Sequence, residues 1–223
     1  MRQKKWDVVV PFRGLECAKT RLAVECKRDL ALAFLRDTLA ALSSSSRIAS
    51  LIVVSRDAGL SKLIDVPVVE DEENGIDAAL EVGFRSLSVH RARSHSAVVL
   101  PDLPALRSGD IDTFLDVASY MPRAFVPDAA GSGTTCLSAR DGVMASVFGV
   151  KSAHHHSQLG YAAILLGVPS LRLDVDTVED LMRAAQLGVG NHTTKLLTND
   201  EELRELSNRA FSENGSAARI GDN

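Results

Sequence analysis

Three aspartates in the sequence have the chemistry and placement of a magnesium site. Asp102 follows an apolar stretch at residues 98–100 and lies between two prolines, whereas Asp174 and Asp176 follow a second short stretch. Mg²⁺ takes one or two carboxylates together with water and phosphate oxygens, so a carboxylate at a strand end suits it. Alternate residues of a strand share a face, so we expect Asp174 and Asp176 to share a metal ion with Asp102.

Structural roles for the same aspartates remain open alternatives. Asp and Pro are common in turns, so Asp102 also fits a turn cap. Thr177 and Asp180 have the spacing of a capping box at a helix N-terminus. Capping accounts for those two residues but leaves Asp174 and Asp176 without a role, which favours metal binding.

A basic loop follows the first apolar stretch of the chain. Segment 11–22 contains Arg13, Lys19 and Arg21, and Gly14 allows close approach of the backbone to a ligand. Lysine and arginine donate charge-assisted hydrogen bonds to phosphate oxygens, so the loop predicts a polyphosphate ligand. Neither GxxxxGK[ST] nor GxGxxG is present. On its own, such a loop is more often a solvated basic surface than a binding site.

Two further segments could hold an anion. Gly131, Gly133 and Thr134 predict a cradle in which backbone N–H groups and a hydroxyl converge on an oxyanion, although a simple turn is the alternative. Ser152 is expected at a helix N-terminus, where free N–H groups favour a phosphate or carboxylate. Residues 154–156 are all histidine, but consecutive helical positions diverge by about 100° and cannot bind one zinc ion together.

The elements that must position these residues alternate between strand and helix patterns. Apolar residues recur at helical spacing between residues 30 and 42, 76 and 84, and 111 and 118, and an apolar helix-like stretch follows at residues 161–166. Such alternation predicts a mostly parallel sheet flanked by helices, with its ligand crevice at the carboxyl ends of the strands. The expected strands are residues 6–11, 50–55, 66–69, 97–100, 124–127 and 171–173.

Composition excludes several classes of protein. The formal net charge of −4 opposes a nucleic-acid partner, because that function needs a clustered basic surface. The apolar residues 8–10 are too few for a signal peptide or membrane span, so we expect a cytoplasmic protein that does not enter a membrane. No CxxC pattern occurs, so the three cysteines are interpreted as free thiols. Residues 1–207 suit a single domain, and residues 208–223 are expected to be a disordered tail.

Five segments, in this order, resemble the family of 2-phospho-L-lactate and phosphoenolpyruvate guanylyltransferases of coenzyme F-420 biosynthesis. Together they extend over most of the chain. They are Val-Pro-Phe-Arg with Ala-Lys-Thr-Arg-Leu at residues 10–22, and segments 98–106, 126–137, 147–156 and 171–181.

The resemblance implies a Rossmann-like GT-A nucleotidyltransferase fold and roles for particular residues. Three differences from the usual family pattern are Arg13 in place of Lys, Asp77 in place of Asn, and Thr135 where Asn is common. The Asp77 carboxylate could accept hydrogen bonds from guanine, or it could compensate the positive dipole charge at a helix N-terminus. The implied sets are Lys19, Arg21 and Asp102 for catalysis; Arg13, Lys19, Arg21 and Asp77 for the nucleotide; Thr134, Gly149 and Ser152 for the acceptor acid; Asp102, Asp174 and Asp176 for Mg²⁺; and His156 as the one histidine that faces the site.

The implied reaction joins GMP from GTP to the phosphate of a small phosphorylated carboxylic acid and releases pyrophosphate. Phosphoenolpyruvate is the favoured acceptor, with 2-phospho-L-lactate or another acid as alternatives, and handover of the product to a downstream transferase is a further conjecture. Cytidylyl- and molybdopterin-type nucleotidyltransferases usually open with a Gly-x-Gly-x-Arg loop, which is absent. A non-catalytic binding protein would lack the metal-site carboxylates, and a nicotinamide oxidoreductase would need a glycine fingerprint.

Overall fold

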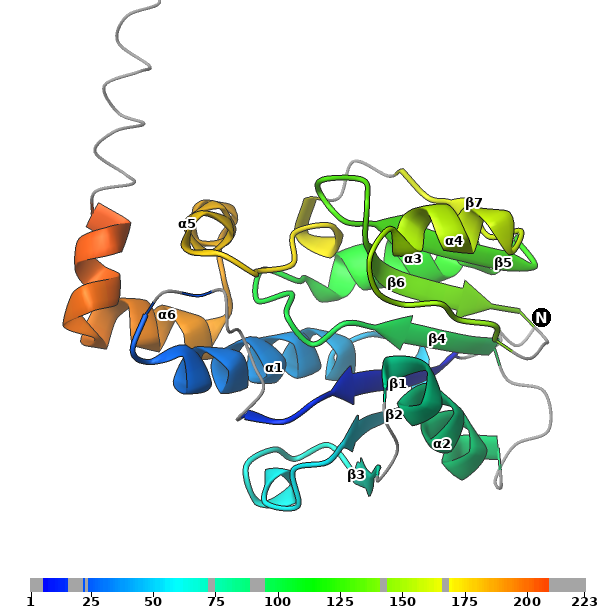
Figure 1. Cartoon of the computed structure of the whole chain (residues 1–223), viewed down its shortest axis with the longest axis horizontal. Coiled ribbons are helices and arrows are strands. Elements are labelled where there is room, and N and C mark those ends of the chain that lie inside the picture. Colours follow the sequence, from blue (N-terminus) through cyan, green and yellow to red (C-terminus); the bar gives the residue numbers. More distant parts are fainter. Residues whose placement is uncertain are drawn as a thin grey trace, which may run out of the picture.

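The computed structural model describes residues 6–15, 22, 24–71, 75–88, 95–140, 144–165 and 169–208 (Figure 1). Within these residues the strands form one seven-stranded sheet in the order β3-β2-β1-β4-β6-β5-β7. Lys19 and Arg21 lie outside the described residues, and so does the predicted tail apart from Asn208.

Most neighbouring strands of the sheet are parallel, as predicted, but β6 runs antiparallel to both β4 and β5. The first residue of β6 therefore lies at the edge where the parallel strands end. The strands are β1 (Trp6–Phe12), β2 (Ile48–Ser55), β3 (Val68–Glu70), β4 (His95–Val99), β5 (Arg123–Pro127), β6 (Thr134–Ala139) and β7 (Ala162–Ala163).

Helices cover both faces of the sheet, and no helix within the described residues is long and apolar enough to cross a membrane. Side chains of α1 and α3 contribute to the core on one face, and side chains of α2 and α4 to the core on the other. Residues 201–208 are also helical. The helices with printed bounds are α1 (Lys27–Ser43), α2 (Ile76–Ser88), α3 (Ser108–Ala118), α4 (Ser152–Gln158), α5 (Val178–Leu187) and α6 (Asn191–Asn199), with short 3-10 helices η2 (Leu60–Lys62) and η3 (Pro169–Leu171).

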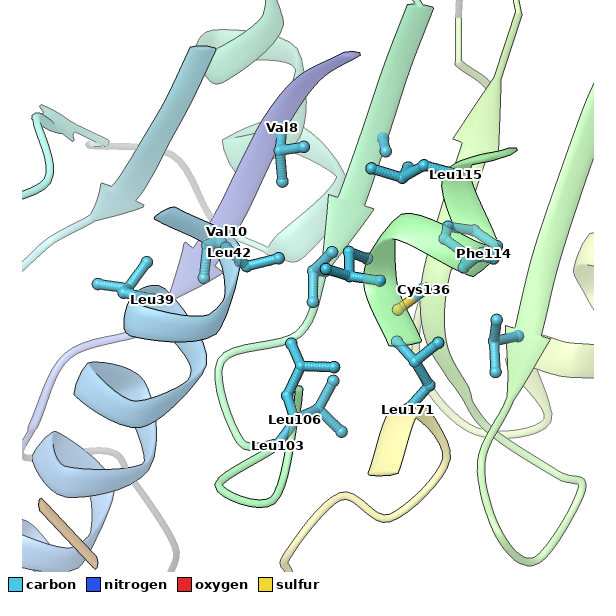
Figure 2. Close-up of a cluster of buried hydrophobic side chains, with 14 of the residues drawn as sticks. Val8, Val10, Leu39, Leu42, Leu103, Leu106, Phe114, Leu115, Cys136 and Leu171 are labelled. Carbon is cyan, nitrogen blue, oxygen red and sulfur yellow. The ribbon is translucent and has the colours of Figure 1, made fainter. Parts of the chain in front are cut away.

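The alternation of β1 places its valines in two separate cores, because successive strand residues face opposite sides. Val8 and Val10 lie in the core that α1 and α3 cover, and Val9 lies in the other. Figure 2 shows the first core, into which Leu103 and Leu106 also point from the loop after β4. This loop carries Asp102, so its backbone is anchored by buried apolar side chains.

Helix α2 approaches the sheet closely through Gly83. A Cβ atom on this glycine would lie 2.8 Å from a methyl carbon of Val9 and 2.7 Å from one of Val54. Real Cβ atoms do not approach carbon so closely, so only glycine fits without a shift of the helix. This packing fixes the start of α2, with Asp77 in its first turn, against the sheet.

A third cluster joins α1 to α5 and α6 beyond the sheet. Asp37 of α1 is 4% exposed, and its carboxylate accepts the backbone N–H groups of His192 (2.9 Å) and Thr193 (2.8 Å). These groups belong to the first turn of α6, where N–H groups have no partner inside the helix. A side chain from α1 thus caps α6 across a long sequence separation.

Three local predictions are wrong. The expected strand at residues 171–173 is absent: Leu171 ends η3, and residues 172–176 adopt no helix or strand. The apolar stretch at 161–166 contains the short edge strand β7 instead of a helix, and residues 134–138, expected in a loop, belong to β6. Short apolar stretches fit either helix or strand, so pairing with neighbouring strands decides between them. The capping box of Thr177 and Asp180 at the start of α5 is confirmed.

Candidate active site

A cavity of about 780 Å³ lies where the parallel strands end. Loops after β1, β4 and β5 reach it, as does the start of the antiparallel β6. The crevice predicted at this edge is therefore present. Its lining includes Arg13, Gly14, Asp102, Asp128, Thr134, Gly149, Lys151, Ser152, Asp174 and Asp176.

Asp102 is held in place through both of its neighbours. The buried hydroxyl of Thr38 in α1 donates to the Pro101 carbonyl (3.2 Å) and accepts the N–H of Leu103 (3.2 Å). The Asp102 carbonyl accepts the N–H of Val175 (3.0 Å). That last bond ties the segment carrying Asp174 and Asp176 to the loop after β4, which explains why all three carboxylates line one cavity although the predicted strand is absent.

The surroundings of Asp174 favour a cation beside it. Burial and, next, the negative charge of Asp102 raise the pKa of Asp174 to about 7, and the charges of Asp176 and Asp128 contribute smaller effects in the same direction. A nearby cation would remove the cost of ionising Asp174. The donor chemistry around Asp174 is therefore that of a hard metal ion.

The predicted three-carboxylate metal set does not form a ready-made cage. Within the described residues, no three His, Cys, Asp or Glu side chains are grouped so that they could hold an ion by themselves. Mg²⁺ needs only one or two protein carboxylates, because water and substrate phosphates complete its shell. Asp102, Asp174 and Asp176 fit such an open arrangement.

The glycine-rich turn after β5 binds its own aspartate. The Asp128 carboxylate accepts the N–H of Ser132 at Oδ1 (2.9 Å) and that of Gly133 at Oδ2 (2.8 Å), and its carbonyl accepts from Gly131 (3.1 Å). The predicted backbone anion cradle is therefore wrong, because these donors are already used. The turn instead fixes the position of Thr134, the first residue of β6.

Thr134, Gly149 and Ser152 come together as the resemblance implied. Thr134 and Ser152 are 3% and 2% exposed, and both line the cavity beside Gly149, which has a φ of +129°. The Ser152 N–H donates to the Gly149 carbonyl (3.1 Å), and the Ala153 N–H to the Ser132 carbonyl (3.1 Å). The expected use of free N–H groups at this helix start is thus wrong, which leaves the hydroxyls of Thr134 and Ser152 as donors.

Cations lie on the cavity lining as well. Arg13 is exposed and lines the cavity directly after β1, as predicted for a phosphate ligand. Lys151 also lines it, and sequence reasoning missed this residue. A basic residue directly before Ser152 was the available signal. Lys151 adopts a left-handed backbone with φ 57°, which is uncommon for a residue other than glycine.

His156 and Asp77 contact the rim of this site from two helices. His156 is fully buried, and its Nδ1 lies 2.9 Å from the Thr134 hydroxyl. Asp77 Oδ1 accepts the Phe148 N–H (3.3 Å), and Asp77 is not among the residues that line the cavity. His156 does not line the cavity either and reaches it only through its hydrogen bond with Thr134. The hydrogen bond of Asp77 goes to the backbone of the rim and gives no support to a contact with guanine.

Solved structures of other proteins share this architecture. The Rv0371c protein of Mycobacterium tuberculosis H37Rv matches with a TM-score of 0.54 and 21% identity, over 83% of this chain and 100% of that one. A 4-diphosphocytidyl-2C-methyl-D-erythritol synthase matches with a TM-score of 0.57 and 14% identity, over 82% of this chain and 99% of that one. At these identities the likeness shows the fold, and it confirms the predicted GT-A-like nucleotidyltransferase architecture.

Other proteins are more similar to this chain in sequence than these solved structures are. Phosphoenolpyruvate guanylyltransferase 2 of Rhodococcus jostii (strain RHA1) is 58% identical over 202 residues, 91% of this chain and 94% of its own length. Phosphoenolpyruvate guanylyltransferase of Streptomyces coelicolor is 40% identical over 199 residues, 85% of this chain and 94% of its own length. The family model described as "Guanylyl transferase CofC like" matches residues 6–213. With a family match over nearly the whole chain and relatives this similar, the protein belongs to the CofC-like guanylyl transferase family.

Proposed function

We propose that this protein transfers the guanylyl group of GTP to the phosphate of phosphoenolpyruvate and releases pyrophosphate, as a step of coenzyme F-420 biosynthesis. The observation that carries the proposal is one cavity lined both by carboxylates suited to a metal ion and by two buried hydroxyls and a lysine. Guanylyl transfer joins two anions, so it needs a metal ion to cancel charge on the triphosphate and donors to bind the acceptor acid. The printed names of the relatives support the same acceptor acid.

The reaction is an in-line exchange of one phosphoanhydride bond for another. An oxygen of the acceptor phosphate attacks the α-phosphorus of GTP, a new P–O–P bond forms, and the bond to the β-phosphate breaks. Pyrophosphate leaves with the electron pair of that bond. A phosphate monoester with its second pKa near 6 is already ionised at neutral pH, so no protein base has to remove a proton.

The task of the protein is therefore to overcome repulsion between two anions and to align them. Arg13, with Lys19 and Arg21 from the same basic segment of the sequence, would bind the triphosphate. Asp102, Asp174 and Asp176 would hold Mg²⁺, which cancels charge on the phosphate oxygens when bound.

The acceptor would lie against the cavity wall that Thr134, Gly149, Lys151 and Ser152 form. The hydroxyls of Thr134 and Ser152 are buried donors for its carboxylate or phosphate, and the backbone at Gly149 leaves room because no side chain projects there. Lys151 adds positive charge to the same wall.

A direct assay tests this function. Purified protein is supplied with GTP, Mg²⁺ and either phosphoenolpyruvate or 2-phospho-L-lactate, and both pyrophosphate release and product mass are recorded. We expect release with GTP and phosphoenolpyruvate and a product mass equal to acid plus GMP minus water. Preference for 2-phospho-L-lactate would replace the acceptor, and no release with either acid would refute the proposal.

Asp102→Asn provides the matched variant, because it keeps the size of the side chain and removes its charge. We expect turnover to fall by at least about 100-fold, the scale of losing one electrostatic group in a transition state. A readout independent of turnover is the rise in melting temperature on adding Mg²⁺ with GTP. The wild type should show it and Asp102→Asn should not; an equal rise in both would remove Asp102 from the metal site.

A further inference from the structure

Residues 147–149 reach the cavity without belonging to a helix or strand. Phe148 and Gly149 line the cavity, and Val147 is 40% exposed. A segment of this kind lacks the ladder hydrogen bonds that fix a strand, so other groups must determine its position.

Two side chains from different helices accept successive N–H groups of this segment. His156 Nε2 in α4 accepts from the Val147 N–H at 3.2 Å. Asp77 Oδ1 in α2 accepts from the Phe148 N–H at 3.3 Å. The segment is thus held from both sides, by a residue nine positions later in the chain and by one 71 positions earlier.

The hydrogen bond from Val147 also fixes the tautomer of His156. Because Nε2 accepts a hydrogen bond, it carries no proton, and the ring proton of the neutral imidazole must be on Nδ1. Nδ1–H then donates to the Thr134 hydroxyl at 2.9 Å. Since the Thr134 oxygen accepts this bond, its own hydrogen remains available to donate to an acceptor acid.

The surroundings of His156 keep the ring in this neutral form. The ring is fully buried, with the Phe148 ring edge-on at 5.1 Å and the Tyr161 ring at 5.6 Å. Burial lowers the pKa of His156 to about 4, against the opposing effect of the Asp77 charge. At neutral pH the imidazole therefore stays uncharged and keeps one donor and one acceptor.

We propose that His156 and Asp77 form a brace that positions the acceptor site, with His156 orienting the Thr134 hydroxyl and both residues fixing the segment at 147–149. This inference rests on the proposed function, because it assigns the braced residues to the acceptor. His156 and Asp77 are positioning residues: they act through Thr134 and Gly149 and do not touch the substrates. The brace predicts that loss of either side chain weakens use of the acid without weakening use of GTP.

Two substitutions separate the two bonds of His156. In His156→Asn the amide nitrogen can replace Nδ1 toward Thr134, but the acceptor for Val147 is lost. In His156→Gln the amide oxygen can replace Nε2 toward Val147, but the donor to Thr134 is lost. We expect each to raise the KM for phosphoenolpyruvate by about three- to tenfold, the scale of one hydrogen bond, with the KM for GTP within about twofold of wild type.

Asp77 is tested by a similar pair. Asp77→Ala removes the acceptor for Phe148 and should raise the same KM by about three- to tenfold, whereas Asp77→Asn keeps a carbonyl oxygen and should recover most of that loss. His154→Asn is the matched control, because His154 is exposed on the same helix as His156. An equal rise in both KM values, or a fall in melting temperature with unchanged KM values, would show a merely structural role and overturn the brace.

A spectroscopic readout separates failure of the brace from failure of the proposed function. The imidazole ¹⁵N spectrum of the wild-type protein at pH 7 should show one buried ring protonated at Nδ1 and unprotonated at Nε2, and this signal should disappear in His156→Asn. The Nε2–H tautomer would overturn the brace even if the enzyme is active. Absence of pyrophosphate release from wild type, with the Nδ1–H tautomer present, would instead refute the acceptor assignment on which the brace rests.

Discussion

Acid should destabilise this protein through the buried imidazole of His156. Burial lowers the pKa of His156 to about 4; the charge of Asp77 opposes the shift and that of His155 adds to it. Protonation would also cost the hydrogen bond from Val147, because Nε2 could no longer accept. At mildly acidic pH, His156 is therefore protonated in the unfolded chain but neutral in the folded protein.

The sign and size of the effect follow from proton linkage. An ordinary histidine has a pKa near 6.5, so the contribution of His156 to stability is fully present above that pH and is lost as pH falls toward about 4. Each pKa unit corresponds to about 1.4 kcal/mol. Between pH 7.5 and pH 5 the free energy of unfolding should fall by about 2 kcal/mol through this one group.

Urea denaturation of wild type and His156→Asn at the two pH values measures the effect. Carboxylates titrate in both proteins, so the difference between the two pH dependences isolates the imidazole. We expect wild type to lose about 2 kcal/mol more than the variant between pH 7.5 and 5. Parallel losses in the two proteins would mean that the ring is protonated or solvated in the fold, which would refute this reasoning.

Substitutions at four further positions test other parts of the structure. Asp37→Ala removes two buried acceptors at the start of α6 and should lower the free energy of unfolding by about 2–4 kcal/mol in urea, and Asp37→Asn, which keeps one oxygen, by about half as much. Gly83→Ala should lower it by about 1–3 kcal/mol because the new methyl group meets the sheet, whereas Gly109→Ala in α3, with open space around it, should not lower the melting temperature. Lys151→Ala should raise the KM for phosphoenolpyruvate about tenfold by removing a cation. Lys151→Gly should raise this KM equally but should unfold at a higher urea concentration than Lys151→Ala, because glycine adopts the left-handed backbone without strain. An unchanged KM in both variants would place the lysine outside the acceptor site.

Much of the framework could be predicted from the sequence, because its signals are local. The expected strands at residues 6–11, 50–55 and 124–127 overlap β1, β2 and β5 almost completely. Periodicity located α1, α2 and α3, and the spacing of Thr177 and Asp180 located the start of α5. These features depend on neighbours within one or two turns of chain, which a single sequence displays directly.

Asp102 was also predictable as a site residue, since a carboxylate after a buried strand of a parallel sheet must lie at the ligand edge. Thr134 was predicted under the same rule in a loop after the strand at residues 124–127, but it begins β6. The antiparallel direction of β6 brings that start to the same edge. Strand direction depends on pairing with β4 and β5, which no local pattern records.

The sequence by itself thus determined the alternating elements and the kinds of residue that meet at the ends of the strands. Only the tertiary structure decided how their hydrogen bonds are used. It brought Asp77 and His156 to successive amides of one segment. Hydrogen bonds require atoms within about 3 Å of one another, and for residues as far apart in the chain as Asp77 and Phe148 that proximity exists only after the sheet and its helices have packed together.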